Sequence, residues 1–391
     1  MLTALAVAGY RSLRELIVPL GRLNVITGPN GSGKSSVYRS LRLLGETARG
    51  GVIASLAREG GLPSTLWAGP ERFSRAMLAG DQPVQPTRRN EPVSLRLGFA
   101  SETFSYAIDL GIPSNHEATS FTLDPVIKRE CIWNGPLLRP STLLVDRRGP
   151  AIFTREGAAS RDDWQSIPQP VASFDSMMTE FSDPRAAPEM IAVREQIRSW
   201  RFYDHFRTDA EAAARLPQIG THTPVLANDG ADLAAALQTV REIGDAAALD
   251  AAIDDAFPGS RVDIDCRDGR FEVTMRQQGL LRALKGAELS DGTLRYLLLV
   301  AALLTPRPPA LLVLNEPETS LHPDLLAPLG RLIARAAAHS QVLVVSHATR
   351  LIAALEREPG SESIVLEKEL GATRIADADD RDLPAWKWPS R

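Results

Sequence analysis

Residues 28–35 read GPNGSGKS and satisfy the pattern G-x-x-x-x-G-K-[ST] of a phosphate-binding loop. Glycines let such a loop turn so that several backbone N–H groups point at one phosphate, and the following helix presents its positive N-terminal end. Lys34 is expected to bridge the β- and γ-phosphates of a nucleotide, and Ser35 to ligate Mg²⁺. The predicted loop comprises Gly28, Pro29, Asn30, Gly31, Ser32, Gly33, Lys34 and Ser35.

The sequence on either side of this loop supplies the strand and the helix that the motif requires. Residues 23–27 (LNVIT) form a short apolar run, which is typical of a buried strand. After the loop, Val37, Leu41 and Leu44 recur at helical spacing. A glycine-rich turn that matches the pattern by accident is the alternative, and this context argues against it.

A second strand signal ends in polar and acidic residues. The apolar residues 311–314 precede the sequence NEPE, as in phosphate-loop enzymes whose metal-facing strand ends in an acidic pair. Asn315 stands at the first position, where Asp is usual. Its amide oxygen can face a metal-bound water, but its lack of charge predicts weaker Mg²⁺ binding and slow hydrolysis. Glu316 is the predicted general base, and an edge loop with stray acids is the alternative.

Two further segments carry polar residues at the ends of predicted elements. Residues 289–295 (LSDGTLR) precede an apolar helix, where Ser290 suits the N-cap and Gly292 leaves room for a backbone approach. Such a helix start is either a phosphate site or a plain N-cap. His347 follows the apolar strand QVLVVS, from where it can reach a γ-phosphate. Taken alone, it is more typical of a loop histidine.

The composition is that of an ordinary globular chain of 391 residues, with 44% hydrophobic and 24% charged residues. Its 44 basic and 48 acidic side chains give a net charge of −4, so no overall basic field attracts nucleic acid or anionic lipid. Cys131 and Cys266 are too few for a disulfide framework. Residues 1–20 do not resemble a signal peptide, and the longest apolar stretch, 296–304, is too short to span a bilayer. We therefore expect a soluble cytoplasmic protein without membrane insertion.

The order of strand and helix signals predicts an α/β core that is interrupted by a long insertion. The core's N-terminal part is expected at residues 1–85, the inserted lobe at 86–280 and the core's C-terminal part at 281–391. Residues 60–92, rich in Gly, Pro, Arg and Gln, are expected to form loops. Within the lobe, the patterns predict antiparallel strands over about 93–155, helices over about 184–257 and a hairpin over about 261–277 that turns at Asp268-Gly269.

The aromatic and charged run WRFYDHF at residues 200–206 is open to two interpretations. Interleaved aromatics and arginines can stack nucleic-acid bases. The favoured alternative is that the run belongs to a predicted helix with one apolar face and one solvated face. His205 and His222 show no metal-ligand spacing.

Together, these motifs resemble those of the ABC-type ATPases of the SMC/RecF/OLD group, and within it those of short stand-alone predicted AAA-type ATPases. The matching pieces occur in the family's order. They are the lead-in GYRSL, the Walker A loop GPNGSGKSS, the signature LSDGTLR, the Walker B strand LLVLNEPETSLHP and the switch histidine in VVSHATR. The resemblance is dense over about residues 1–50 and 285–355 and thin between them. It implies an α/β P-loop NTPase fold, namely an ABC-type ATPase head with an antiparallel β subdomain and an inserted helical lobe.

In this family two heads enclose two ATP molecules, so the resemblance implies ATP and Mg²⁺ as cofactors and a head-to-tail homodimer. Residues 28–36, which add Ser36 to the loop, would hold the phosphates in cis. Ser290 and Gly292 would reach the γ-phosphate in trans. Arg11 matches the family's lead-in arginine, for which a place near the nucleotide and a solvated surface position both stay open.

Three further positions concern the same site. Residues 319–322 match the D-loop, which crosses the dimer axis in the family. Arg295 is either a basic switch on the signature helix or, in the favoured reading, a surface charge of that helix. The family's Q-loop glutamine has no clear counterpart, although Gln82 and Gln85 lie in the matching region.

The expected function is that of an ATP-binding and slowly ATP-hydrolysing enzyme, which couples its nucleotide state to DNA or to a separate effector protein. DNA is implied by the resemblance alone. The chain after His347 is too short for the nuclease region of OLD proteins, and no long coiled coil is present. Two alternatives remain: a non-hydrolysing ATP switch, in which Asn315 makes turnover negligible, and a transporter ATPase subunit, which the long insertion disfavours. DNA repair, phage defence and regulation all stay open as processes.

Overall fold

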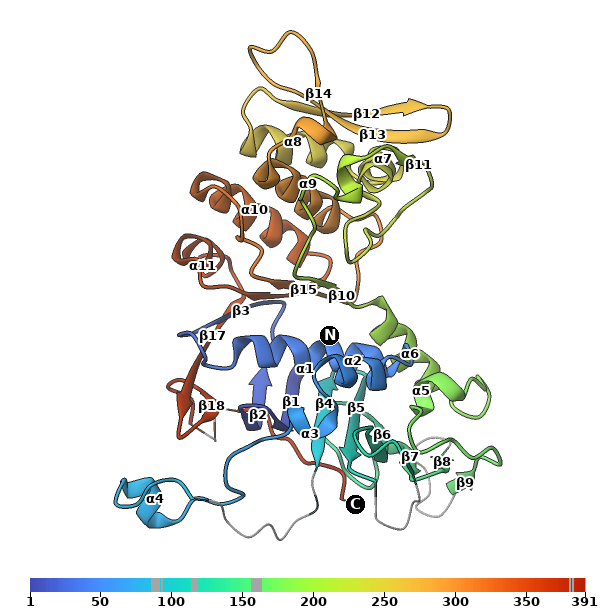
Figure 1. Ribbon diagram of the computed structural model, residues 1–391. Helices are drawn as coiled ribbons and strands as arrows, with labels where there is room; N and C mark the ends of the chain where they lie inside the picture. The colour runs from blue at the N-terminus through green and yellow to red at the C-terminus, as the bar shows by residue number, and fades with distance from the viewer. Residues whose placement is uncertain are drawn as a thin grey trace. The chain divides into compact units, whose positions relative to one another are not determined.

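An antiparallel sheet organises the first of the two units into which the chain divides (Figure 1). This unit comprises residues 1–20, 28–198 and 364–391, and the second comprises 21–27 and 199–363. The computed structural model describes residues 1–85, 92, 94–113, 119–155, 164–379, 381 and 383–390.

The antiparallel sheet has the strand order β2-β1-β4-β5-β6-β7-β8-β9. Its middle strands β5 and β6 are buried along almost their whole length. The strands are β1 (Leu2–Tyr10), β2 (Leu13–Pro19), β4 (Leu95–Ser101), β5 (Phe104–Gly111), β6 (Val126–Asn134), β7 (Leu143–Arg148), β8 (Ala151–Arg155) and β9 (Trp164–Ser166).

Helix α1 (Lys34–Thr47) packs against β1 and β4 of this sheet (Figure 1). Its apolar stripe Val37, Leu41 and Leu44 is fully buried, as the helical spacing of these residues predicts. The other helices of the unit are α2 (Val52–Arg58), α3 (Leu62–Thr65), α4 (Arg75–Ala79), α5 (Met177–Glu180) and α6 (Pro188–Ser199). A hairpin of β17 (Ser361–Glu369) and β18 (Ala372–Ile375) belongs to this unit from Ile364 onward.

A charged pair lies in the interior of the antiparallel sheet. Arg147 on β7 and Glu130 on β6 have no exposed side-chain surface, and their Nη1 and Oε2 atoms are 2.6 Å apart. Glu130 also accepts hydrogen bonds from the Tyr106 hydroxyl (2.7 Å), the Ser176 hydroxyl (2.6 Å) and the backbone N–H of Met177 (2.8 Å). The pair is therefore fully hydrogen-bonded, which offsets the cost of removing two charges from water.

Four parallel strands in the order β10-β15-β16-β3 form the sheet of the second unit. Their interior positions are almost continuously apolar and buried, which is typical of a parallel sheet that is covered on both faces. The strands are β10 (Arg201–Tyr203), β15 (Leu311–Asn315), β16 (Gln341–Val345) and β3 (Leu23–Thr27).

The helices of the second unit pack around α9, whose residues from Leu294 to Leu303 are all buried. Helix α9 contacts α7, α8 and α10. The small antiparallel sheet of β11–β14 packs against α7 and α8 (Figure 1). The bounds are α7 (Leu233–Ile243), α8 (Ala246–Ala256), α9 (Asp291–Leu303), α10 (Leu326–Ala337), α11 (Thr349–Leu355), β11 (Gln218–Ile219), β12 (Arg261–Arg267), β13 (Arg270–Arg276) and β14 (Leu284–Lys285).

The structure confirms most of the predicted elements. The strand before the phosphate loop, the antiparallel strands of the region 94–155 and the helix after the signature all form. The hairpin turn at Asp268-Gly269 also forms, and both residues have positive φ angles of 49° and 73°, as a tight two-residue turn requires. Cys131 and Cys266 are free thiols.

The prediction that residues 200–206 belong to a helix was wrong. Helix α6 ends at Ser199, and Arg201–Tyr203 form strand β10, which pairs in parallel with β15. Phe202 and Tyr203 are buried in this arrangement, so neither ring is available to stack a base. Aromatic side chains are favoured in strands, and pairing with a buried neighbour overrides the helical pattern.

Two further predictions needed correction. The alanine-rich segment 232–257 forms two helices, because the chain turns at Gly244 and the Asp245 side chain caps α8 by accepting a hydrogen bond from Ala248. The region 60–92 contains the short helices α3 and α4 rather than loops alone. Its residues 86–91 lie outside the described part of the chain.

The division into two units follows boundaries other than those expected from the sequence. Strands β4–β9, which were expected in an inserted lobe at 86–280, share one sheet with β1 and β2. The partition at 1–85, 86–280 and 281–391 stays a prediction about domains. Among the described residues, no helix combines the length and the apolar character that crossing a membrane requires.

Candidate functional site

Three parallel strands place polar residues from distant parts of the sequence at one edge of the second unit's sheet. In the register of the strands, Ile26 on β3 lies beside Val345 on β16, and Val345 lies beside Asn315 on β15. Parallel strands end at the same sheet edge, where ligands bind in open α/β sheets. In the sequence, the phosphate loop follows β3 directly, and His347 follows β16.

The conformation of the phosphate loop requires glycine at several positions. Gly28, Gly31 and Gly33 have φ angles of 139°, 79° and 110°, which L side chains rarely adopt. A Cβ atom on Gly28 would lie 2.1 Å from the carbonyl oxygen of Leu366, and one on Gly33 would lie 2.2 Å from Oγ1 of Thr373. The motif glycines are therefore needed for the turn and for close packing.

Lys34 and the start of α1 provide the positive charge of this loop. The buried Lys34 ammonium group donates hydrogen bonds to the carbonyl oxygens of Gly28 (2.7 Å) and Pro29 (3.0 Å), so it lies inside the curve of the loop. No side chain caps α1, and Gly33 at the N-cap has none to offer. The N–H groups of an uncapped helix start can bind an anion. Ser35, on the first turn, is exposed.

Thr373 holds the phosphate loop from outside the motif. Its hydroxyl group hydrogen-bonds to the carbonyl oxygen of Ser32 and to the hydroxyl of Ser12, each at 2.8 Å. The backbone N–H of Thr373 also donates to the carbonyl oxygen of Ser12 at 2.8 Å. The sequence did not single out Thr373, because a threonine on a hairpin strand carries no motif.

The end of β15 combines an uncharged oxygen with an exposed carboxylate. The Oδ1 atom of Asn315 is buried and has no hydrogen-bond partner in the part of the chain that the structure describes. A buried polar atom without a partner is rare, so this oxygen fits a site for a metal-bound water. Glu316 has a positive φ angle of 48°, its N–H group donates to the carbonyl oxygen of Val345 (2.8 Å), and its side chain is 44% exposed. The Glu316 carboxylate is therefore partly open to solvent at the end of the strand.

Glu318 fixes the histidine loop. Its Oε1 atom accepts hydrogen bonds from the Ser346 hydroxyl (2.7 Å) and from the N–H groups of His347 (3.0 Å) and Ala348 (3.2 Å). Nδ1 of His347 lies 3.5 Å from this atom and 3.9 Å from Oε1 of Glu316. The structure thus brings together Glu316 and His347, both predicted from the sequence. It adds Glu318, whose buried position was not evident from the acidic sequence NEPE.

The signature segment opens α9 with an exposed serine. Ser290 is the N-cap, and its Oγ atom accepts a hydrogen bond from the N–H group of Thr293 at 3.2 Å. A Cβ atom on Gly292 would lie 2.9 Å from the carbonyl oxygen of Ser320. Because Gly292 has no side chain, the backbone of residues 319–322 in the same chain can pack closely against it. The neighbouring Asp291 pairs with the buried Arg215 at 2.5 Å, which anchors the first turn of the helix.

A protein-family profile described as "AAA domain, putative AbiEii toxin, Type IV TA system" matches residues 23–353. The match includes the phosphate loop, the signature segment, β15 and His347. The chain belongs to this AAA-domain family. The predicted membership in the AAA-type P-loop ATPases is thereby confirmed.

Solved structures of SMC heads share the fold of this AAA-domain chain. An SMC head bound to the C-winged helix domain of ScpA has a TM-score of 0.52 and 12% identity, covering 96% of this chain and 97% of that chain. The SMC head from Pyrococcus furiosus, with an extended coiled coil and bound to the C-terminal domain of ScpA, has a TM-score of 0.50 and 11% identity, covering 96% and 95%. At this identity the likeness shows the fold alone. Among curated proteins, none matches the sequence.

Arg295 of this AAA-domain chain is buried, so the favoured reading as a surface charge was wrong. Its Nη2 atom donates to the carbonyl oxygens of Asp204 (3.2 Å) and Glu316 (3.4 Å). Burial lowers the pKa of Arg295, because removal from water disfavours its charge. The side chain therefore connects the signature helix to the turn that carries Glu316.

Arg11 forms an ion pair with an acidic residue of the first unit. Its guanidinium group forms an ion pair with Glu59, which also accepts hydrogen bonds from the Tyr10 hydroxyl at 2.9 Å. Burial, followed by the charge of Glu59, raises the pKa of Tyr10 above its usual range. Arg11 itself is partly exposed. Its predicted role in nucleotide binding stays a prediction.

Proposed function

We propose that this AAA-domain chain binds ATP with Mg²⁺, closes into a head-to-tail homodimer around it and hydrolyses it slowly. The P-loop ATPase fold supports nucleotide binding in general. The alignment of Ile26, Val345 and Asn315 carries the finer proposal, because it starts the phosphate loop, the histidine loop and the acidic turn at one sheet edge.

In this proposal, residues 28–36 hold the phosphates. Lys34 exchanges its hydrogen bonds with Gly28 and Pro29 for bonds to phosphate oxygens, so its charge stays paired in both arrangements. Ser35 supplies a hydroxyl oxygen to Mg²⁺, and Asn315 supplies Oδ1 to a metal-bound water. Mg²⁺ would neutralise negative charge on the phosphate oxygens.

The chemical step would depend on Glu316 and His347. The exposed Glu316 carboxylate orients the attacking water and accepts its proton. His347 contacts the γ-phosphate, and Glu318 supports this role by fixing the backbone of the histidine loop through two N–H groups. Since catalysis of phosphoryl transfer is mainly a matter of positioning, a fixed loop contributes directly to the rate.

The signature segment is the basis for the proposed dimer. Ser290 is exposed at the N-terminus of α9, where helix dipole and N–H groups favour an anion. Ser290 and Gly292 would contact the γ-phosphate bound by a second copy. Residues 319–322, next to Gly292, would then lie near the dimer axis.

The partner is a separate effector protein or DNA. The SMC heads with this fold are described as bound to domains of ScpA, which supports a protein partner. The proposal of DNA as the partner rests on the family resemblance alone. The proposal also includes a cytoplasmic location.

A second function, a non-hydrolysing ATP switch, is favoured by one observation. Asn315 brings no negative charge to the metal-facing position, so Mg²⁺ would be held less firmly during hydrolysis. In this version ATP binding alone closes the dimer.

Phosphate release from Mg-ATP, measured across a range of protein concentrations, tests both versions. A specific rate that rises with protein concentration supports a composite site built by dimerisation. ATP binding and ATP-dependent dimerisation without phosphate release would support the switch. An absence of ATP binding would overturn both.

A further inference from the structure

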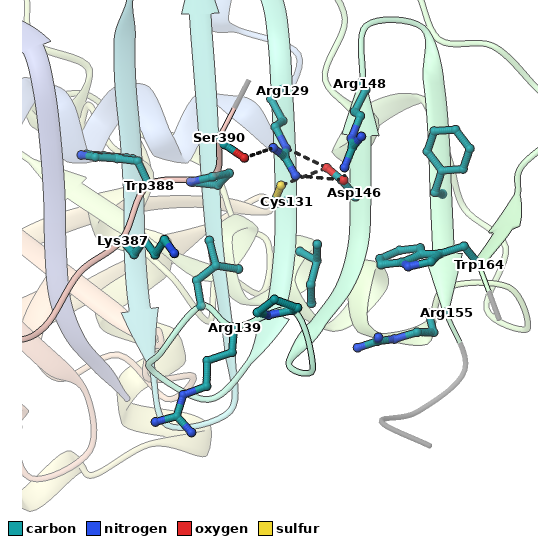
Figure 2. A pocket seen from close by; sticks show the side chains of 15 residues that line it. Arg129, Cys131, Arg139, Asp146, Arg148, Arg155, Trp164, Lys387, Trp388 and Ser390 are labelled. Atoms are coloured by element: carbon teal, nitrogen blue, oxygen red, sulfur yellow. Dashed lines mark hydrogen bonds and ion pairs between the residues drawn. The ribbon is translucent and has the colours of Figure 1, made fainter. Parts of the chain in front are cut away.

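A pocket of about 660 Å³ lies in the first unit, over the strands β6, β7 and β8 (Figure 2). The loop at 138–140 and the C-terminal segment 387–390 complete its walls. None of its lining residues belongs to the phosphate loop. Its volume is in the range of pockets that bind small ligands.

The lining of this pocket is strongly basic. Among the described residues, Arg129, Arg139, Arg148, Arg155 and Lys387 line it, together with one carboxylate, Asp146. Asp146 is already engaged. It accepts two hydrogen bonds from Arg129 at 2.9 Å, one from Arg148 at 2.9 Å and one from the Cys131 thiol at 3.2 Å. Among the described lining residues, no further acid faces the remaining positive charge.

One of these cations is buried with an unused donor. Arg155 is 5% exposed, and its Nη2 atom donates to the carbonyl oxygen of Ser141 at 2.8 Å. Its Nε atom is buried, and the described residues offer it no acceptor. Arg155 lines the pocket, so its guanidinium group, which is always charged, adds to the basic lining.

Aromatic rings stand next to these cations. The Arg155 guanidinium group lies 5.3 Å from the ring centroid of Trp164. Figure 2 shows Trp164 and Arg155 on one side of the pocket and Trp388 and Lys387 on the other. Indole rings are platforms on which a nucleic-acid base can stack, and arginine forks bind phosphate.

We propose that this pocket binds a nucleotide, with its base against an indole ring and its phosphate on Arg155, Arg148 and Lys387. The combination of rings and excess cations favours a nucleotide over an acidic peptide, which offers carboxylates but no flat ring. The nucleotide is either a free mononucleotide or the end of a single strand. A mononucleotide and a strand end both offer a base that can stack and a phosphate that can pair with cations.

Binding should be tested by calorimetry on the full-length Lys34→Ala variant, in which the phosphate loop is disabled. The probes are adenosine monophosphate and a 5′-phosphorylated tetradeoxyadenylate, with a hexaglutamate peptide as competitor. Arg148 and Lys387 are exposed, so Arg148→Gln combined with Lys387→Gln removes both charges without placing an acid beside the buried Asp146. Trp164→Leu tests the stacking platform, and Arg185→Glu, an exposed arginine outside the pocket, is the matched control.

We expect the double variant and Trp164→Leu each to weaken binding about tenfold, while Arg185→Glu has no effect. Binding of the mononucleotide identifies a free nucleotide as the ligand, and binding of the oligonucleotide alone identifies a strand end. The proposal is overturned if neither probe binds or if the pocket variants bind normally. It is also overturned if hexaglutamate displaces the probes and Trp164→Leu has no effect.

Discussion

The middle of the antiparallel sheet and the edge of the parallel sheet treat polar groups in opposite ways. In the antiparallel sheet, Glu130 and Arg147 are completely buried and every described contact of the carboxylate is a hydrogen bond to a donor. At the edge of the parallel sheet, Asn315 has a buried oxygen without a partner and Glu316 is exposed. The difference separates groups that hold the fold from groups that are left for a ligand.

The largest effect is expected for Lys34→Ala, which should abolish ATP binding. The ammonium group is the one cation that the loop itself encloses in the described structure. Calorimetric titration with Mg-ATP measures the loss, and Arg39→Ala, an exposed position on the same helix, is the control. Retained affinity in Lys34→Ala would contradict the assignment of the loop.

Glu130→Gln should lower the free energy of unfolding by about 3–5 kcal/mol, because it leaves Arg147 buried without a counter-charge. Urea unfolding measures this change. The matched control is Glu102→Gln, whose exposed ion pair with the N-terminus should contribute at most about 1 kcal/mol. Equal effects of the two variants would mean that burial of the Glu130–Arg147 pair adds nothing to its contribution to stability.

Glu316→Gln should reduce phosphate release by about 100-fold or more, since it removes the general base. ATP binding should persist, and an ATP-bound dimer should accumulate, which size-exclusion chromatography with light scattering detects. The free energy of unfolding should change by less than about 0.5 kcal/mol, because the side chain is exposed. A variant that stays monomeric with ATP would argue against the proposed role.

Ser290→Arg should block dimer closure while ATP binding in cis is retained, because a bulky cation at the exposed start of α9 obstructs the second copy. Sedimentation with and without ATP measures closure. The same preparation, titrated with ATP, serves as the control for the phosphate loop. Loss of both dimer closure and ATP binding would mean that Ser290 does not act in trans.

The smallest effect is expected for Asn315→Asp. The added charge should lower the Mg²⁺ concentration that supports half-maximal ATP binding by a few-fold and raise turnover. A magnesium titration at fixed ATP measures the shift. If turnover falls instead, the asparagine serves another purpose at this position.

The parts of the site that the sequence predicted are those where backbone geometry demands particular residue types. Glycines with positive φ angles, such as Gly31, and apolar runs that end at a loop can be recognised without a structure. The parts that it missed depend on long-range contacts. Glu318 and Arg295 became significant only through burial beside His347 and Glu316, and β10 formed only because β15 was available to pair with it.

Thr373 has a consequence for the synthesis of the protein. It lies 341 residues after Ser32, whose carbonyl oxygen it holds. A chain emerging from the ribosome therefore exposes its phosphate loop long before the hydroxyl group that fixes that loop has been translated. Domains generally fold as units during synthesis. Nascent and truncated chains would thus lack this support of the phosphate loop until Thr373 has been translated.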